Sequence, residues 1–166
     1  MLRIAVCSDT HGYLGDTSWM QPCDEIWHAG DWGPGVVEQL PPGKTVRGVH
    51  GNIDGSHIRK IFPEELIFEV EQIRVFMRHI GGYPGRYEKG VASRLDAVRP
   101  LIFVCGHSHI LKIMRDPQRQ GMWCINPGAA GRTGLHQVRT AVRLTLEQGN
   151  ISALEVVELG PRSAAP

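Results

Sequence analysis

The amino-acid sequence predicts an α/β sandwich with mixed β-sheets. In the early part of the chain apolar, strand-like runs alternate with helical patterns, and in the later part strand-like runs follow one another as hairpins. The runs that we expect to form strands are 2–7, 24–29, 44–49, 66–70, 73–77, 101–105, 111–115, 122–126, 138–146 and 150–158. No repeat or linker interrupts them, so we expect a single domain over residues 1–159.

The strands are predicted from residue type and from how each run ends. Residues 2–7 are mostly apolar and partly β-branched, which is typical of a short buried strand. Residues 24–29, 44–49 and 101–105 are similar, and a glycine with a polar neighbour follows each of them. Only two residues separate 66–70 from 73–77, which indicates a hairpin.

Three segments indicate short helices. Residues 34–40 carry a proline in the first turn and are followed by a Pro-Pro-Gly segment that ends them. Helical spacing over 87–98 predicts an amphipathic helix that Pro100 stops. The residues with this spacing are Tyr87, Val91, Leu95 and Val98. We also expect a short helix over 17–23, and we expect residues 160–166 to be a disordered tail.

The composition limits the class of protein. A hydrophobic content of 42% and a charged content of 21% in 166 residues are ordinary for a globular domain. The net charge of +1 provides no field that would attract long nucleic acid or anionic lipid. The first strand begins at residue 2, and no apolar run reaches the roughly 20 residues that span a bilayer, so we expect a cytoplasmic protein outside the membrane. The four cysteines form no C-x-x-C pair, and we expect reduced, mostly buried thiols.

Residues of metal-binding type follow five of the predicted strands. They are Asp9 and His11, Asp31, Asn52, His79, and His107 with His109. Asp9 and His11 are two residues apart, and extended backbone would place both side chains on one side, with roughly 6.6 Å between their Cα atoms. A single strand-end Asp is more often a cap, and a single His is more often a hydrogen-bonded structural residue. Their joint occurrence at strand ends nevertheless predicts one shared site.

The number of these residues predicts two metal ions. Seven ligands exceed the four that one tetrahedral zinc ion takes, whereas two ions of higher coordination number that share one carboxylate can use them all. Oxygen and nitrogen ligands without thiolate favour Mn, Fe, Zn, Co or Ni, and manganese is our first expectation. Two such ions about 3.5–4 Å apart suit in-line displacement at phosphorus, because they lower the pKa of a bridging water and neutralise phosphate oxygens.

The order of the motifs resembles the calcineurin-like metallophosphoesterase superfamily. The motifs are Asp-x-His at 9–11, Gly-Asp at 30–31, Gly-Asn-x-Asp at 51–54, the strand-end His79 and Gly-His-x-His at 106–109. The segments 28–31, 50–54 and 125–128 are similar to its small, single-domain YfcE-type phosphodiesterase branch. The resemblance extends from Leu2 to about Glu158 and implies two facing mixed sheets flanked by helices.

The resemblance also implies roles for individual residues. It implies that the first ion is held by Asp9, His11 and His109. It implies that the second ion is held by Asn52, His79 and His107, and that Asp31 bridges the two. Asn52 would also bind a phosphate oxygen, and Asp54 would orient its neighbours from behind. Asp31, Asn52 and His107 are therefore the residues that we expect to take part in catalysis, by in-line attack of a metal-bridging hydroxide on small phosphodiesters.

Two departures from the family pattern affect the expectations. Many members carry His after the Gly-Asn asparagine, where it stabilises the transition state or protonates the leaving group, and here that residue is Ile53. Its absence could cost roughly 10²–10⁴-fold on poor leaving groups, unless His57 on the same loop replaces it. The bulky Ile80 after His79 predicts a displaced loop.

The substrate side is less specific in the sequence. Arg132, in the glycine-rich turn after residues 126–128, is our candidate for a phosphate contact. With no capping domain, we expect the metal face to be open, or covered only by loops and a neighbouring copy in a homo-oligomer, and to take a small phosphodiester or nucleotide-like substrate. The alternatives are a phosphomonoesterase or nucleotide pyrophosphatase, and a catalytically weak binding scaffold that resembles the retromer subunit of the same family.

Overall fold

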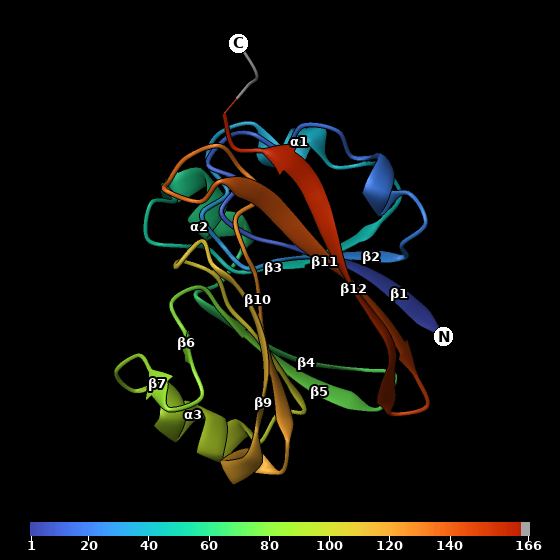
Figure 1. Cartoon of the computed structure of the whole chain (residues 1–166), viewed down its shortest axis with the longest axis vertical. Helices are drawn as coiled ribbons and strands as arrows, with labels where there is room; N and C mark the ends of the chain where they lie inside the picture. Colours follow the sequence, from blue (N-terminus) through green and yellow to red (C-terminus); the bar gives the residue numbers. More distant parts are fainter. Residues whose placement is uncertain (164–166) are drawn as a thin grey trace.

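Two five-stranded mixed β-sheets face each other in the computed structural model, which describes residues 1–163 (Figure 1). The first sheet has the strand order β12-β11-β1-β2-β3. Its strands are β1 (Leu2–Cys7), β2 (Glu25–His28), β3 (Thr45–Gly48), β11 (Val138–Glu147) and β12 (Asn150–Pro161). Strands β1, β2 and β3 are parallel, and β11 pairs antiparallel with both β1 and β12.

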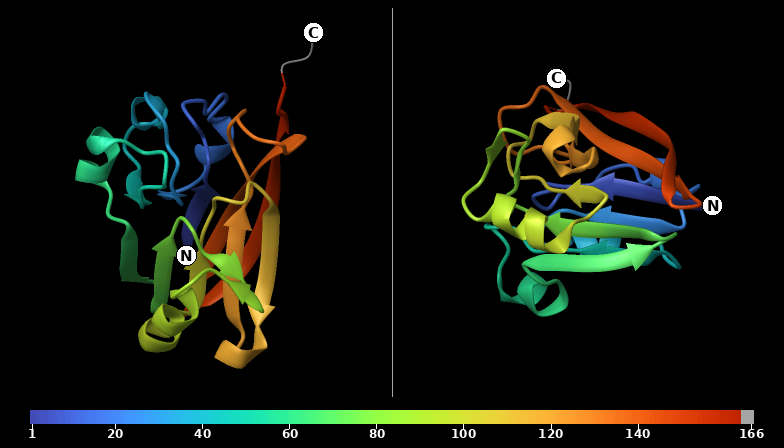
Figure 2. Two further views of the ribbon diagram at one scale, coloured as in Figure 1. Left: turned by 90° about the vertical axis from the view of Figure 1, so that its left-hand side faces the viewer. Right: turned by 90° about the horizontal axis from the view of Figure 1, so that it is seen from below.

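The second sheet has the order β4-β5-β8-β10-β9. Its strands are β4 (Glu65–Val70), β5 (Ile73–Arg78), β8 (Ile102–Val104), β9 (Leu111–Asp116) and β10 (Met122–Pro127). The three central strands are parallel and the two edge strands are antiparallel. This arrangement confirms the predicted sandwich of mixed sheets, and the right-hand view of Figure 2 shows the strands of the two sheets as neighbouring layers.

The alternation of side chains along β1 explains why the sheets stack. Ile4 and Val6 belong to the apolar core between the sheets, whereas Ala5 and Cys7 belong to a second cluster on the outer face. Both faces of β1 are therefore covered, as its continuous apolar run requires. All four cysteines are buried and free, which confirms the expectation from the sequence.

Short helices cover the outer faces and the loop end. They are η1 (Ser18–Met20), α1 (Val36–Gln39), α2 (Ser56–Ile61), α3 (Val91–Val98) and η2 (Pro117–Arg119). Helix α3 packs Val91, Leu95 and Val98 against Phe76 and Phe103 of the second sheet. Figure 1 shows α1 and α2 together at the upper end and α3 at the lower end. None of the helices among residues 1–163 has the length and apolar character that crossing a bilayer requires.

Several predicted boundaries were wrong. The helix expected over 87–98 begins only at Val91, because Gly90 adopts a left-handed φ of 80° that separates it from the preceding residues. Tyr87 instead lies in β7 (Arg86–Tyr87), which forms a two-stranded hairpin with β6 (Gly82–Tyr83). The helix expected over 17–23 is the single 3-10 turn η1, and the one expected over 34–40 shrinks to α1.

The expected boundary of the domain also shifts at its end. Strand β12 continues to Pro161, and the backbone N–H of Arg162 donates to the carbonyl of Gln137 at 2.8 Å. Residues 160–162 are therefore part of the sheet or bonded to its edge rather than a disordered tail. The remainder of the predicted tail, residues 164–166, lies outside the described residues.

Candidate metal centre

All seven residues that the sequence singles out lie on loops that follow parallel strands of the two sheets. Asp9 and His11 follow β1, Asp31 follows β2, Asn52 follows β3, His79 follows β5, and His107 with His109 follow β8. Backbone hydrogen bonds join these loops, since the Asp9 N–H donates to the Gly30 carbonyl at 2.9 Å and the Gly106 N–H donates to the His79 carbonyl at 2.9 Å. Each of these bonds joins loops of one sheet. The His107 backbone N–H donates to Oδ2 of Asp9 at 3.0 Å and joins the two sheets, so their carboxyl ends form one site.

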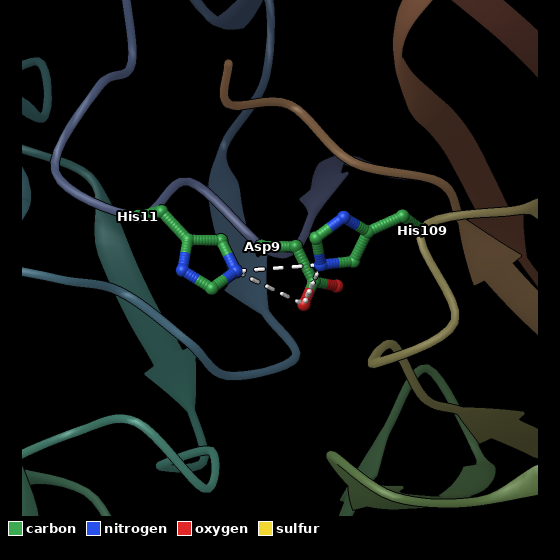
Figure 3. Close-up of side chains that lie close together, drawn as sticks. All are labelled: Asp9, His11 and His109. Atoms are coloured by element: carbon green, nitrogen blue, oxygen red, sulfur yellow. Dashed lines mark hydrogen bonds and ion pairs between the residues drawn. The ribbon is translucent and has the colours of Figure 1, made fainter. Parts of the chain in front are cut away.

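The first group of potential ligands consists of Asp9, His11 and His109. Figure 3 shows the two imidazoles on either side of the Asp9 carboxylate. The Nε2 atom of His109 lies 3.2 Å from Oδ1 of Asp9, and Nε2 of His11 lies 3.8 Å from the same oxygen. The two Nε2 atoms are 3.3 Å apart. One carboxylate oxygen and two ring nitrogens thus converge on a single point.

The second group consists of Asp31, His79 and His107. The Nε2 atom of His79 lies 3.2 Å from Oδ2 of Asp31. Asn52 joins this group through its Oδ1 atom, which lies 3.1 Å from Nδ1 of His107. Asn52 and His107 are exposed, whereas Asp31 and His79 are buried, so the second group has a closed floor and an open mouth.

The two groups are in contact with each other. Oδ2 of Asp31 lies 3.6 Å from Nε2 of His11, which belongs to the first group. Conversely, Oδ1 of Asp9 lies 3.8 Å from Nε2 of His79 in the second group. Each carboxylate therefore faces histidines of both groups, and Oδ2 of Asp31 lies between His11 and His79.

Hydrogen bonds to the outer oxygen of each carboxylate fix which oxygen faces the histidines. Oδ2 of Asp9 accepts from the Ser8 hydroxyl at 2.7 Å and from the His107 backbone N–H at 3.0 Å. Oδ1 of Asp31 accepts from the Ile53 backbone N–H at 3.0 Å. The opposite oxygens, Oδ1 of Asp9 and Oδ2 of Asp31, are thereby directed toward the imidazoles.

The donor set of the site fits bound cations. Nδ1 of His79 donates to the carbonyl of Ala29 at 2.7 Å, so its Nε2 carries the lone pair in the neutral ring. Oδ1 of Asp9 and Nε2 of His79 are buried, and neither has a hydrogen-bond partner among residues 1–163. Buried acceptors that face one another without a donor are costly, and a cation between them satisfies both. Carboxylate oxygens and imidazoles without thiolate are ligands that divalent transition metals accept.

Attraction between carboxylates and imidazoles in the site lowers the pKa of Asp9 and raises the pKa values of His11 and His79. Burial alone would raise the pKa of Asp9, but the imidazoles of His109, His11 and His79 that face its carboxylate outweigh the burial and hold that pKa well below its usual range. The nearby carboxylate of Asp9 raises the pKa of His11. The pKa of His79 is also raised, since its contact with Asp31 outweighs its burial. Asp9 is therefore a fixed negative charge that favours cations.

The backbone at the site is not extended, contrary to the expectation for Asp9 and His11. Five of the seven residues have left-handed backbone. They are Asp9 (φ 54°), His11 (φ 44°), Asp31 (φ 56°), His107 (φ 72°) and His109 (φ 62°). Such values are uncommon outside glycine and cluster at functional sites. Asp9 and His11 still share one point, but tight loops bring them there rather than the alternation of a strand.

Glycines allow these loops to pack closely. A Cβ atom at Gly51 would overlap Oδ1 of Asp31, and a Cβ atom at Gly106 would overlap the Ser8 hydroxyl. The glycines of the Gly-Asn and Gly-His motifs are thus sterically required, because any side chain there would displace a residue of the site.

Asp54 and His28 hold the loops from behind. Asp54 is buried, and its carboxylate accepts from the backbone N–H groups of Gly51 at 2.8 Å, Gly33 at 3.1 Å and Trp32 at 3.2 Å. It therefore ties the loop after β3 to the loop after β2. Nδ1 of His28 accepts from the Gly30 N–H at 3.1 Å, while its Nε2 lies 3.0 Å from the Thr10 hydroxyl. Burial lowers the pKa of His28 to about 3, so the ring is neutral.

The sequence analysis also made expectations for the loop after His79, for His57 and for Arg132. The loop after β5 is not displaced by Ile80, since His79 is buried against the second group. His57 lies on α2 with its side chain 75% exposed and 4.0 Å from Glu38, and it belongs to neither group of potential ligands. The guanidinium of Arg132, our candidate for a phosphate contact, lies 3.9 Å from the centroid of the Tyr13 ring. Tyr13 belongs to the loop that follows His11.

Sequence reasoning did not single out His136. Its ring lies 5.5 Å from the ring of His109, and its Nε2 lies 2.9 Å from the carbonyl of Gly131. Gly134 brings the two rings together, because a Cβ atom there would overlap Nδ1 of His109. No motif surrounds His136, so the sequence offers no signal for this contact.

Several solved structures have the same fold as this chain. A solved archaeal phosphodiesterase superimposes with a TM-score of 0.75 at 18% identity, over 95% of this chain and 100% of that chain. A Thermotoga maritima protein gives a TM-score of 0.69 at 23% identity, over 96% and 100%. Vps29 from Entamoeba histolytica, solved in complex with Zn²⁺, gives 0.68 at 13%, over 98% and 100%. These likenesses show a shared fold.

A search among curated protein sequences finds no match to the chain. The profile of the calcineurin-like phosphoesterase superfamily domain, however, matches residues 2–149, which contain every residue of the two ligand groups. The chain therefore belongs to the calcineurin-like phosphoesterase superfamily.

Proposed function

We propose that this protein is a metal-dependent phosphodiesterase with a dinuclear centre that acts on small phosphodiesters. The observation that carries the proposal is the position of Asp31, whose Oδ2 lies 3.2 Å from Nε2 of His79 and 3.6 Å from Nε2 of His11. One carboxylate oxygen between histidines of two groups is the arrangement that a bridging ligand needs. Two ions held by these groups would share the carboxylate of Asp31.

The ligand groups divide between two sites. One ion would be held by Asp9, His11 and His109. The other would be held by Asn52, His79 and His107. Asp31 would contact both. Manganese is the first choice for a mixed oxygen and nitrogen set with an amide ligand, and nickel, iron, zinc and cobalt also accept these donors.

The buried and the exposed residues of the site have different roles in the proposed reaction. Divalent ions bound at such a centre lower the pKa of water and neutralise phosphate oxygens. Buried Asp9, Asp31 and His79 form the floor, which excludes bulk water. Exposed Asn52 and His107 lie at the mouth, where the substrate enters. With its Oδ1 facing His107, Asn52 is positioned to donate its amide N–H to a phosphate oxygen.

The space around the second group favours a diester over a monoester. One cavity is lined by Asn52 and His79 together with Arg59 and Arg78. A separate cavity adjoins His107. A phosphodiester carries an organic group on each side of phosphorus, and each cavity offers room for one of them. A phosphomonoester would fill only one.

Hydrolysis of bis-(p-nitrophenyl) phosphate in the presence of Mn²⁺ or Ni²⁺ tests the proposal. We expect turnover by the wild-type chain and its loss in Asp31→Asn, which keeps the size of the side chain but removes the charge. Asp96→Asn is the matched control, because Asp96 is 64% exposed and pairs only with Arg119 at 2.9 Å among the described residues. Normal turnover in a correctly folded Asp31→Asn protein would refute the proposal.

The same assay separates the alternatives. A phosphomonoesterase or pyrophosphatase would hydrolyse p-nitrophenyl phosphate or a dinucleoside pyrophosphate faster than the diester. A catalytically weak binding scaffold would show no rate above that of free metal. We expect the diester to be hydrolysed fastest.

A further inference from the structure

The cavity beside His107 is lined by charged residues that the proposed chemistry does not use. It has a volume of about 310 Å³ and adjoins the metal centre through Gly106, His107 and Ser108. Its lining also includes a wall formed by Tyr83, Arg86 and Lys112, with Nζ of Lys112 over the Tyr83 ring. A group attached to a phosphate at His107 can therefore extend directly into this cavity.

The wall is held in place before any ligand binds. Tyr83 and Arg86 are opposite one another in the β6–β7 hairpin. At one end of the hairpin the Gly82 carbonyl accepts from the thiols of Cys105 at 3.5 Å and Cys124 at 3.9 Å. At the same end the Tyr87 hydroxyl donates to Asp116 at 2.6 Å, because Tyr87 is the partner of Gly82 in the hairpin. Anchoring at the base of the hairpin lowers the ordering cost of binding.

The cations in this cavity lack anionic partners. Lys112 and Arg86 form no salt bridge with any acidic side chain among residues 1–163. Glu88 is the single acid in the lining, so positive charge exceeds negative. In the cavity on the other side of the centre, Arg78 pairs with Glu65 at 2.7 Å, and the guanidinium of Arg59 donates to the carbonyls of Asp54 and Gly51. Among the described residues the arginines of that cavity are thus held by groups of the protein, whereas Arg86 and Lys112 have no acidic partner.

The aromatic ring in the wall does not favour a nucleobase. Nζ of Lys112 lies 3.5 Å from the centroid of the Tyr83 ring, which covers one face. Tyr83 also packs against the apolar cluster beneath α3. A stacked base would have to displace the lysine. An anion, by contrast, can bind the ammonium group where it is.

We propose that this cavity binds a second phosphate group on the substrate, so that the preferred substrate is a phosphodiester whose organic substituent carries a terminal phosphate monoester. Lys112 and Arg86 would bind that phosphate by charge-assisted hydrogen bonds. The hydroxyl of Ser108, which accepts from Asn126 at 3.0 Å and from the Ile110 N–H at 3.2 Å, can add a further donor. This inference rests on the proposed function, which it makes more specific.

A pair of substrates that differ only in the second phosphate tests the inference. The pair is thymidine 5′-(p-nitrophenyl phosphate) and its 3′-phosphorylated form. With Mn²⁺ present, we expect the wild-type kcat/KM to be at least about tenfold higher for the 3′-phosphorylated substrate. In Lys112→Gln and Arg86→Gln this ratio should fall severalfold. Lys89→Gln removes a neighbouring exposed lysine that does not line the cavity, and it should keep the wild-type ratio.

Calorimetry without metal separates failure of the cavity from failure of the enzyme. In EDTA, thymidine 3′,5′-bisphosphate should bind more tightly than thymidine 5′-monophosphate, and Lys112→Gln should remove the difference. A wild-type kcat/KM ratio near one, or a ratio unchanged by Lys112→Gln, would overturn the inference. If neither substrate is hydrolysed, the proposed function fails, and the calorimetric comparison alone decides the cavity, with equal affinities counting against it.

Discussion

The backbone N–H of Ile53 donates a hydrogen bond of 3.0 Å to Oδ1 of Asp31. Ile53 occupies the position at which many members of the family carry a histidine. Its backbone still orients the carboxylate that lies between the two ligand groups, while its side chain is 48% exposed and has no proton to give. The loop after β3 therefore still orients Asp31, but it presents no acid at this position.

We expect Ile53→His to increase the rate selectively for substrates with poor leaving groups. A positioned acid contributes roughly 10²–10⁴-fold when the leaving group needs a proton, and little for p-nitrophenolate. The measurement is the ratio of kcat/KM for an alkyl ester to that for a p-nitrophenyl ester. Ile53→Gln, which is polar but cannot donate a catalytic proton, serves as the control. An unchanged ratio in Ile53→His would show that no acid is missing at this position.

Gly51→Ala should inactivate the protein, because the added methyl group overlaps Oδ1 of Asp31 and must displace it. We expect a loss of at least about 10²-fold in kcat/KM, as for other displaced catalytic groups. Gly55→Ala on the same loop is the control, since a Cβ atom there meets nothing within 4 Å. Equal activity of the two variants would contradict this steric account.

Asp54→Ala should weaken metal binding without removing a ligand. The backbone N–H groups of Trp32, Gly33 and Gly51 would lose their common acceptor, and the two loops would no longer be tied together. A loss of about 10–100-fold in Mn²⁺ affinity is expected for such a partner. Titration with Mn²⁺ followed by electron paramagnetic resonance measures it, and unchanged affinity would assign Asp54 no role in the centre.

His28 should make the folded state sensitive to acid. Burial lowers its pKa to about 3, whereas in the unfolded chain the ring binds a proton near its ordinary pKa of 6.5. Between these two pKa values the unfolded state holds more protons than the folded state. The contribution of His28 to the free energy of unfolding is therefore complete above the pKa of the unfolded chain. It falls by up to ~1.4 kcal/mol per pH unit as the pH decreases toward the lower value.

Urea unfolding of the metal-free protein measures this effect. The free energy of unfolding of the wild type should fall more steeply between about pH 7 and about pH 5 than that of His28→Gln, which has no titrating ring. Parallel slopes for the two proteins would mean that folding does not lower the pKa of His28.

Much of the fold and nearly all of the centre could be predicted because the signals are local. The apolar residues 4–7 of β1 and the whole of β8 are buried, and residues of metal-binding type follow both strands. Their common location follows from parallel strands, which place their carboxyl ends together.

The errors arose where tertiary contacts override local patterns. Tyr87 has helical spacing with Val91, but it pairs with Gly82 in the β6–β7 hairpin and its hydroxyl donates a hydrogen bond to Asp116. Helix α2 was missed because Ile58 is its single buried residue, which is too little periodicity to detect. The left-handed backbone of Asp9 and His11 is imposed by bonds to the Gly30 and Asp31 carbonyls, which no sequence pattern of the first strand contains.

The number of ions that the chain binds tests the dinuclear centre most directly. Purified protein stripped with chelator, dialysed against Mn²⁺ and examined by elemental analysis should hold two ions per chain, because two groups of potential ligands lie side by side and Oδ2 of Asp31 faces a histidine of each. Asp31→Asn should hold fewer than two. A wild-type chain that binds one ion or none at saturating Mn²⁺ would contradict the account.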